Sequence, residues 1–520
     1  MPLNRMEHWM SRKEPDSPLP EVKETLSEGE ERFDRWRKKI GLPAGPLLAL
    51  LVFFLPLDLP PDAHRMAALL TFAVVFWITE PIPIAMTALV GPFLAVLFGI
   101  GKAEEVLASF GHPILFVFIG SFLLARAMEI HRLDRRFSLW LLSMKWIKNS
   151  PHRLLWMVGF IAAFMSMWIS NTAATAMIFP IALGLLASLN ELSNRGGSRS
   201  YATALMLMVA YSASVGGIGT PIGSPPNLIG IGMIGKQTGR HITFFEWMSL
   251  AIPILIVMYA ALYFLLVFLL VPKRLQTGDV SKFISDQKKE IGPWSRGEKN
   301  AFFAFLLAVF LWIVPGILAL MFGAEGAAVK LYSSRLPEGA VAIFAASFLF
   351  FLPTDWAKQE FTLSWRDASQ IDWGTILLFG GGLALGELMF KTGLSRAVGE
   401  GLFSLFSIGS LWGITGMAIL MGIVVSELTS NTAAANMVVP VIISLANASG
   451  VSPIPPALGA TLGASYGFML PISTPPNAIV YSSGLIPIGK MMMAGILFDA
   501  LGFLIIWGGL ILLCPLLGLI

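Results

Sequence analysis

Two short polar motifs each occur twice in this chain, once per half and in the same order. Ser170-Asn171-Thr172-Ala173 returns as Ser430-Asn431-Thr432-Ala433, and Ser224-Pro225-Pro226-Asn227 returns as Thr474-Pro475-Pro476-Asn477. The first pair is separated by 260 positions (170 to 430) and the second by 250 (225 to 475). All four copies lie in strongly apolar sequence. Repeated halves with helix-breaking polar segments are typical of membrane transporters that build one site from two related elements.

Composition places these motifs in a membrane protein. Hydrophobic residues make up 55% of the 520 residues, charged residues 13%, and the mean hydropathy is +0.73, which excludes a soluble globular chain. The single cysteine, Cys514, excludes an intrachain disulfide and a thiolate metal cluster. Apolar runs that can form all or part of a membrane span are Leu47 to Leu57, Met66 to Thr79, Ile242 to Val271, Ala301 to Phe322 and Met491 to Cys514.

The distribution of basic residues predicts topology. Residues 1–41 are hydrophilic and lack the apolar core and cleavage site of a signal peptide, so we expect a cytosolic amphipathic arm. Basic residues cluster at positions 35–39 and again in the polar segment Lys273 to Lys299, and the positive-inside rule puts both in the cytosol. The net charge of +4 is therefore a topology signal, and no basic patch favours nucleic acid.

Length predicts two helical hairpins. Leu154 to Asn190 has no charged residue, yet as one helix it would run about 55 Å. Split at Ser170, it gives two arms of roughly 24 to 27 Å, each slightly shorter than the hydrocarbon core. We expect a re-entrant hairpin whose polar tip lines a cavity, because non-helical backbone at membrane depth needs protein or water partners. Leu411 to Leu445 repeats the design around Ser430.

Glycine-rich sequence precedes each proline motif, at 216–223 and 463–473, and predicts interrupted helices. Free amides at the start of a half-helix attract anions, and free carbonyls at an end attract cations. Segments 154–190, 200–235 and 401–489 contain no lysine or arginine, and their only acid is Glu427. An anionic ligand would therefore need a bound cation. Hydroxyl, amide and carbonyl oxygens suit sodium, and mutual stabilisation of the two ions gives coupling.

Simpler interpretations exist for these residues. Ser-Asn-Thr is a good helix N-cap and Pro-Pro-Asn a good turn, but the duplication of both favours a functional role. An amphipathic helix is expected along the membrane surface between Arg132 and Arg153. Three histidines near span ends are expected to anchor or cap, and three acids in or beside apolar runs either function or pair within the bundle. These are His112, His131, His152, Glu80, Glu129 and Glu387.

With these motifs the chain resembles the divalent anion/sodium symporter family, transporters of succinate, malate, citrate and, in some members, sulfate. The resemblance covers nearly everything after the arm. It implies an all-α polytopic membrane protein with two inverted repeats, two re-entrant helical hairpins, two broken helices and eleven spans. It also implies an elevator mechanism, in which a transport domain moves against a scaffold domain that forms a homodimer. The amino end would be cytosolic and the carboxyl end outside.

The resemblance also implies a ligand set. The substrate would meet Asn171, Thr172, Ser224, Asn431, Thr432, Thr474 and Pro475. One sodium ion would lie among Ser166, Ser170, Asn171 and Gly223, and a second among Ser426, Thr429, Asn431 and Ser473, several through backbone carbonyls. Glu427 either shapes the second hairpin or binds directly, and the former is favoured. No catalytic residue and no organic cofactor are expected.

The expected organisation follows the two repeats, in a bacterial inner (plasma) membrane with its lipid as a partner. The segments are the arm 1–41, scaffold helices 42–110, first-repeat transport elements 111–235 (hairpin 154–190, broken helix 200–235), scaffold helices with a cytosolic loop 236–372 (loop 272–299), second-repeat transport elements 373–489 (hairpin 408–447, broken helix 456–483), and a final transmembrane helix 490–520.

The predicted function is sodium-coupled import of a dicarboxylate of the succinate, malate or fumarate class. Alternatives are a sodium-independent dicarboxylate exchanger, a sodium-coupled citrate or sulfate transporter, a passive anion channel, and an intramembrane enzyme. Gly463-Ala464-Ser465-Tyr466-Gly467 matches a nucleophile elbow in letters, but no histidine follows His241, and no His-Glu-x-x-His occurs. We therefore expect no enzyme.

Overall fold

The structure is a computed structural model and describes residues 28–144, 150–192, 199–272, 281–323, 326–406 and 408–520. It is almost wholly helical; within those ranges the strands are β1 (Pro353–Asp355) and β2 (Glu360–Phe361), paired antiparallel. Most of the predicted arm 1–41, part of the loop 272–299 and part of the surface helix 132–153 lie outside the described residues.

The first half runs from the arm to a long apolar helix. Its first described helix runs from Glu28 past position 41, so the described end of the arm is helical, with Asp34 pairing to Arg37 and Lys38 one turn on. The elements are α2 (Glu28–Phe54), α3 (Pro61–Thr79), α4 (Ile84–Leu97), α5 (Ala103–Ala108), η1 (Ser109–Gly111), α6 (Pro113–Ile130), α7 (Leu133–Leu142), α8 (Pro151–Ser166), α9 (Asn171–Leu192), α10 (Arg199–Gly217), α11 (Pro225–Thr238) and α12 (Phe244–Leu270).

The second half repeats this order from α16 onward. Its elements are α13 (Ser281–Ile291), α14 (Arg296–Phe322), α15 (Ala327–Arg335), α16 (Glu338–Phe351), the β1–β2 hairpin, α17 (Trp365–Ala368), α18 (Trp373–Lys391), α19 (Leu394–Phe406), α20 (Leu411–Leu428), α21 (Asn431–Ala448), α22 (Ile454–Gly463), α23 (Pro475–Tyr481) and α24 (Ile488–Leu516).

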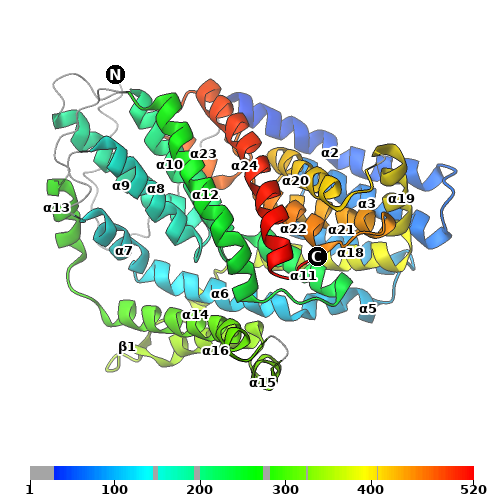
Figure 1. Ribbon diagram of the computed structural model, residues 1–520, viewed down its shortest axis with the longest axis horizontal. Helices are drawn as coiled ribbons and strands as arrows, with labels where there is room; N and C mark the ends of the chain where they lie inside the picture. Colours follow the sequence, from blue (N-terminus) through cyan, green and yellow to red (C-terminus); the bar gives the residue numbers. More distant parts are fainter. Residues whose placement is uncertain (1–27, 145–149, 193–198, 273–280, 324–325, 407) are drawn as a thin grey trace.

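Three hydrophobic clusters organise the molecule. The largest joins α6 to α12 with α20 to α24 and includes every interrupted helix. A second lies between α3, α4 and α18, and a third between α6, α12, α14 and α16. Figure 1 shows α14 to α16 along one edge below α6, and α2, α3 and α19 grouped at one end. The interrupted helices therefore form a central body with a packed group of helices on either side.

Contacts between the interrupted helices are paired across the two halves. Helix α10 packs on α8 and α9, as α22 packs on α20 and α21. Between halves, α23 packs on α9 and α10, as α11 packs on α21 and α22. The elements that begin with the four polar motifs therefore interlock.

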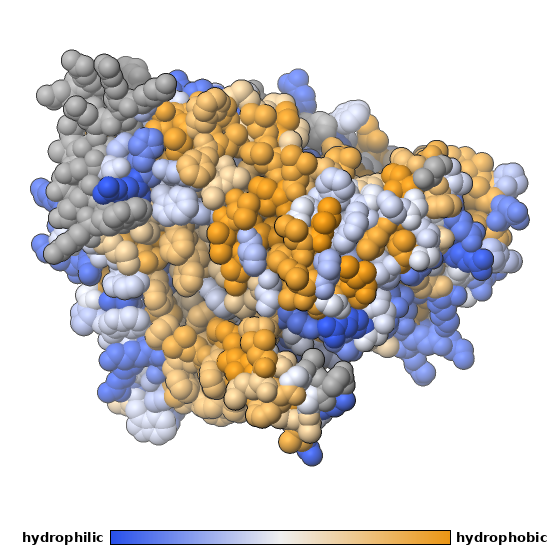
Figure 2. Space-filling view, in the orientation of Figure 1, coloured by the Kyte–Doolittle hydropathy of each residue, from blue (hydrophilic) through white to orange (hydrophobic). Residues whose placement is uncertain are grey.

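Helix length and composition select nine of the described helices as able to cross a membrane, or ten if the bent pair α15 and α16 forms one span. Apolar side chains gather over the middle of the face in Figure 2, with hydrophilic ones around its margin. The chain is thus an integral membrane protein. Eleven spans, re-entry and inverted topology stay predictions.

Candidate functional site

Both Ser-Asn-Thr motifs interrupt a helix and begin the next one. Helix α8 ends at Ser166 and α9 begins at Asn171, while α20 ends at Leu428 and α21 begins at Asn431. The Ser170 hydroxyl accepts from the Ala173 amide at 3.2 Å, and Ser430 repeats this bond with Ala433 at 3.3 Å. The motifs do act as N-caps, which starts a new helix after each break.

A serine on the first arm of each hairpin also binds the asparagine that begins the second arm. The Ser166 hydroxyl donates to Asn171 Oδ1 at 2.6 Å, and the Ser426 hydroxyl donates to Asn431 Oδ1 at 2.8 Å. These are four of the predicted sodium ligands. A polar bond therefore closes each break at the same place in both halves.

The Pro-Pro-Asn motifs end the interruptions of α10 and α22. Asn227 Nδ2 donates to the carbonyls of Gly217 and Thr220, both at 2.8 Å. Asn477 Nδ2 donates to the carbonyls of Gly467 and Leu470, both at 3.0 Å. Both asparagines are fully buried. The motif alone did not predict this role for the two asparagines. The signal that could have indicated it is their position two residues after the first proline in both copies.

Backbone oxygens converge on Gly223 in the first half. A Cβ added there would lie 2.6 Å from the Gly217 carbonyl oxygen and 2.8 Å from that of Ser166. The Met167 carbonyl oxygen would be 3.0 Å away. Asn171 Oδ1 adjoins Gly217, being 2.2 Å from a Cβ built on that glycine. Only a residue without a side chain fits here, and the hard oxygens around it are the type that sodium takes.

The second half brings together most of its predicted sodium ligands. Ser426 and Ser473 are buried, and a Cβ added at Gly467 would lie 3.2 Å from both the Ser426 carbonyl oxygen and Ser473 Cβ. Thr429 differs. Its hydroxyl donates to the Trp77 carbonyl on α3 at 3.0 Å, which leaves its backbone oxygen as the group available to an ion.

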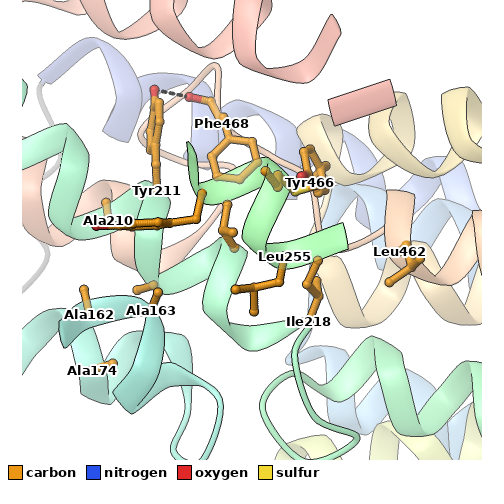
Figure 3. Close-up of a cluster of buried hydrophobic side chains, with 14 of the residues drawn as sticks. Ala162, Ala163, Ala174, Ala210, Tyr211, Ile218, Leu255, Leu462, Tyr466 and Phe468 are labelled. Atoms are coloured by element: carbon orange, nitrogen blue, oxygen red, sulfur yellow. Dashed lines mark hydrogen bonds between the residues drawn. The ribbon is translucent and has the colours of Figure 1, made fainter. Parts of the chain in front are cut away.

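Glu427 binds the interruption that follows α22. Its Oε1 accepts from the Met469 amide at 2.9 Å, and its Oε2 accepts from the Ser473 hydroxyl at 2.5 Å. Both bonds shape the loop that carries Ser473. At the second break the arrangement favours a structural role of Glu427 over direct ligation of the sodium predicted there. In the same loop the Phe468 carbonyl accepts from the Tyr211 hydroxyl at 2.6 Å, so the loop is tied to α10 (Figure 3).

The predicted substrate residues differ in exposure. Thr172 and Pro475 are exposed, while Asn171, Asn431 and Thr432 are half-buried. Ser224 and Thr474 are buried at the starts of α11 and α23, and Thr474 Oγ1 has no hydrogen-bond partner within the described part of the chain. Because α23 packs on α9 and α11 packs on α21, each proline motif accompanies the hairpin of the other half.

Charged groups near these elements are paired elsewhere. Lys236, in the last turn of α11, lies 2.7 Å from Glu387, and Glu129 and Glu80 lie 2.8 Å and 3.3 Å from arginines. The three acids noted in the sequence thus pair with basic residues, and Glu129 does so on the exposed surface of its own helix. His112 caps α6, and the His131 ring bonds the Thr362 carbonyl, as expected for capping and anchoring histidines.

The described part of the predicted surface helix is α7, and it is anchored to its neighbours. Arg136 pairs with Glu298 at the start of α14 at 2.5 Å, and Arg135 pairs with Glu290 of α13 at 3.1 Å. Two arginines in consecutive positions therefore hold this helix to the segment that follows α12.

Comparisons with known proteins show which family the chain resembles. The sequence pattern of the sodium:sulfate symporter transmembrane region matches residues 40–519. The sodium-dependent dicarboxylate transporter SdcS of Staphylococcus aureus, in strains bovine RF122 / ET3-1 and NCTC 8325 / PS 47, is 34% identical over 477 residues, which are 90% of this chain and 89% of SdcS. In fold, the chain is similar to MtrF of Neisseria gonorrhoeae, with a TM-score of 0.54 at 11% identity, over 89% of this chain and 97% of MtrF.

Proposed function

The chain belongs to the sodium:sulfate symporter family of membrane transporters, and on that premise we propose that it imports a dicarboxylate together with sodium. The observation that carries the proposal is the pair of closed breaks, in which Ser166 binds Asn171 and Ser426 binds Asn431. The SdcS relatives, similar along most of the chain, are named for sodium-dependent dicarboxylate transport. A succinate, malate or fumarate class substrate therefore fits better than sulfate.

In this proposal each half supplies one carboxylate clamp. Asn171 and Thr172 bind one carboxylate, and Asn431 and Thr432 bind the other, with Ser224, Thr474 and Pro475 completing the site. The backbone amides at the starts of four helices add positive partial charge. No lysine or arginine occurs in the helices that carry these residues until Lys236, which is paired with Glu387.

Sodium provides the missing positive charge. One ion binds among Ser166, Ser170, Asn171 and Gly223, where carbonyl oxygens converge. The other binds among Ser426, Thr429, Asn431 and Ser473. Each cation lowers the cost of burying the dianion, and the dianion lowers the cost of burying each cation, so binding is reciprocally coupled. The transport body can then move its site across the membrane only when the site is empty or when it holds both sodium and the dicarboxylate.

Movement follows an elevator mechanism, with the interrupted helices as the transport body and the flanking helices as the scaffold. The buried residues of α3, α4, α14 and α16 belong to two smaller hydrophobic clusters and not to the largest one, which supports this division. The same two clusters include residues of α18 and α6, where the two parts meet. The hairpins are re-entrant, the halves are inverted repeats, and the scaffold forms a homodimer. The protein resides in the plasma membrane with its amino end and the 272–299 loop in the cytosol.

Uptake of labelled succinate into liposomes that hold the purified protein tests the function. We expect uptake with an inward sodium gradient and background uptake when potassium or choline replaces sodium. Unlabelled malate should compete, and sulfate should compete weakly. Uptake that continues without sodium and is driven by unlabelled succinate on the opposite side of the liposome membrane would contradict the proposal. It would show that the protein is an exchanger.

A further inference from the structure

A second carboxylate lies beside Glu427 and has no role in the site described above. Asp499 of α24 and Glu427 are each 7% exposed, and their carboxylates face each other. Glu427 accepts hydrogen bonds at both oxygens. Asp499 accepts none from the described residues at either oxygen. Two acidic groups thus share a buried space, and one of them lacks any donor.

Close packing fixes the position of Asp499. Gly495 and Gly502 lie four residues before it and three after it, on the same face of α24. A Cβ at Gly495 would lie 2.5 Å from the Phe468 carbonyl, and one at Gly502 would lie 2.1 Å from the Tyr466 ring. This face of α24 therefore presses on the loop after α22, and Asp499 points into the contact.

Tyr466 supplies a further oxygen without a partner. Its side chain is fully buried and lies close enough to Asp499 for an electrostatic interaction. Its hydroxyl lacks a hydrogen-bond partner among the described residues. Figure 3 shows Tyr466 beside Phe468, in the loop that Tyr211 ties to α10. The Tyr211 hydroxyl is already committed to the Phe468 and Met491 carbonyls, at 2.6 Å and 3.2 Å. The Tyr466 hydroxyl is therefore an oxygen near Asp499 that has no hydrogen-bond partner among the described residues.

Among the residues that the structure describes, no basic group forms an ion pair with either carboxylate. Helices α12, α20 and α22, which pack on α24, contain no lysine, arginine or histidine. The basic residue of α24, Lys490, lies nine positions before Asp499 and bonds Ser200. The other titratable groups of the elements packed here are Glu246, Tyr259 and Tyr263 of α12, Cys514 of α24, and Tyr201 and Arg199 near the start of α10.

Buried charges in proteins are paired or bind a cation, and ionisable groups inside a membrane bundle mark ion pathways. We propose that Asp499, with Glu427 and the Tyr466 hydroxyl, forms an additional sodium site, distinct from the sites at the two breaks. This inference rests on the proposed sodium-coupled function. Glu427 bonds Ser473, so occupation of the additional site stabilises the loop that carries a ligand of the second break site. Three sodium ions per dianion also make each cycle carry one net positive charge.

The test measures the number of sodium ions transported per succinate in liposomes. The membrane potential and the sodium gradient are fixed, and the succinate gradient at which net succinate flux stops gives this number. We expect three sodium ions per succinate for the wild type and two for Asp499→Asn, which keeps the side-chain volume. Tyr466→Phe should keep the stoichiometry and raise the half-saturating sodium concentration about threefold or more. Ser483→Ala, on the loop before α24, serves as a control without effect.

Each result decides the inference. A wild-type ratio of two overturns it whether or not any variant folds, and so does an unchanged ratio in Asp499→Asn that elutes as a folded protein. A variant that changes only the pH dependence of uptake indicates a shared proton and also overturns it. Wild-type uptake that does not depend on sodium refutes the proposed function itself, which is a separate outcome.

Discussion

The two breaks of this protein are built alike but differ in charge. Each has a serine that donates to the asparagine beginning the next helix, and each has a buried asparagine that holds two carbonyls of the neighbouring interruption. In the first break Met167 occupies the position that Glu427 occupies in the second (167 + 260 = 427). The shared part is what the duplicated motifs encode. The acidic part is specific to the second half.

The consequences of this difference are visible in the hydrogen bonds. In the first half the Thr220 hydroxyl donates to the Met167 carbonyl, so a neutral bond joins the hairpin to the interruption. In the second half the Glu427 side chain makes that connection through the Met469 amide and the Ser473 hydroxyl. A neutral break surrounded by carbonyls and an acidic break beside a second carboxylate are not equivalent environments for a cation. We expect them to differ in sodium affinity.

The largest effect is expected from substitutions that remove the asparagine that both breaks share. Asn171→Ala and Asn431→Ala each delete a proposed ligand for both substrate and sodium, and each removes the amide oxygen that accepts from Ser166 or Ser426. We expect succinate uptake to fall to background in both variants. Asn447→Ala, an exposed position near the end of α21, is the matched control and should keep wild-type uptake.

Gel filtration and thermal unfolding in detergent separate lost function from lost folding in these variants. Full uptake by one of the two would remove that residue from the site and would show that only one half binds substrate.

The next largest effect concerns the buried asparagines of the interruptions after α10 and α22. It tests whether each asparagine stabilises its interruption to the same extent. Asn227→Ala and Asn477→Ala each remove two buried hydrogen bonds and leave two carbonyls unpaired, which costs about 1–3 kcal/mol of unfolding free energy. Both variants should show a lowered midpoint of thermal unfolding and roughly tenfold lower uptake. A variant that loses uptake with an unchanged midpoint would mean that the asparagine contacts the substrate instead.

Sequence analysis predicted much of this because breaks in helices are local. Ser170 and Ser430 are N-caps followed by new helices, and Pro225 and Pro475 begin α11 and α23, as the motif chemistry predicts. Membership of the family, transport and the membrane setting were confirmed by the comparisons and the helices.

Other features depend on contacts between distant segments, which spacing does not encode. The Thr429 hydroxyl reaches Trp77, 352 residues away in the chain, a contact that the motif does not predict. Asp499 lies inside the apolar run Met491 to Cys514 and was missed, although a lone acid in such a run was a usable signal. Its proximity to Glu427 came only from the packing of α24 on α20.

A smaller effect concerns the acidic difference itself. Glu427→Gln keeps an oxygen for the Met469 amide and a polar contact for Ser473 but removes one negative charge. We expect normal folding and a roughly tenfold rise in the half-saturating sodium concentration, as for a charge a few ångströms from a cation in partly solvated protein. Met167→Leu, at the corresponding position of the first break, is the control and should leave sodium dependence unchanged. Equal sodium dependence in all three proteins would show that the two breaks do not differ in the way their charges suggest.

The smallest expected effect separates the two possible uses of Thr429. In the structure its hydroxyl joins the tip of the second hairpin to α3, a contact between the central body and a flanking group of helices. Thr429→Val keeps the shape and loses this bond, which is worth about 0.5–1.5 kcal/mol. If the hydroxyl serves only this contact, uptake should change by less than about threefold and the half-saturating sodium concentration should stay the same, because the backbone oxygen is retained. A sodium requirement raised tenfold or more would instead return the hydroxyl to the ion site and would mean that its bond to Trp77 breaks when sodium binds.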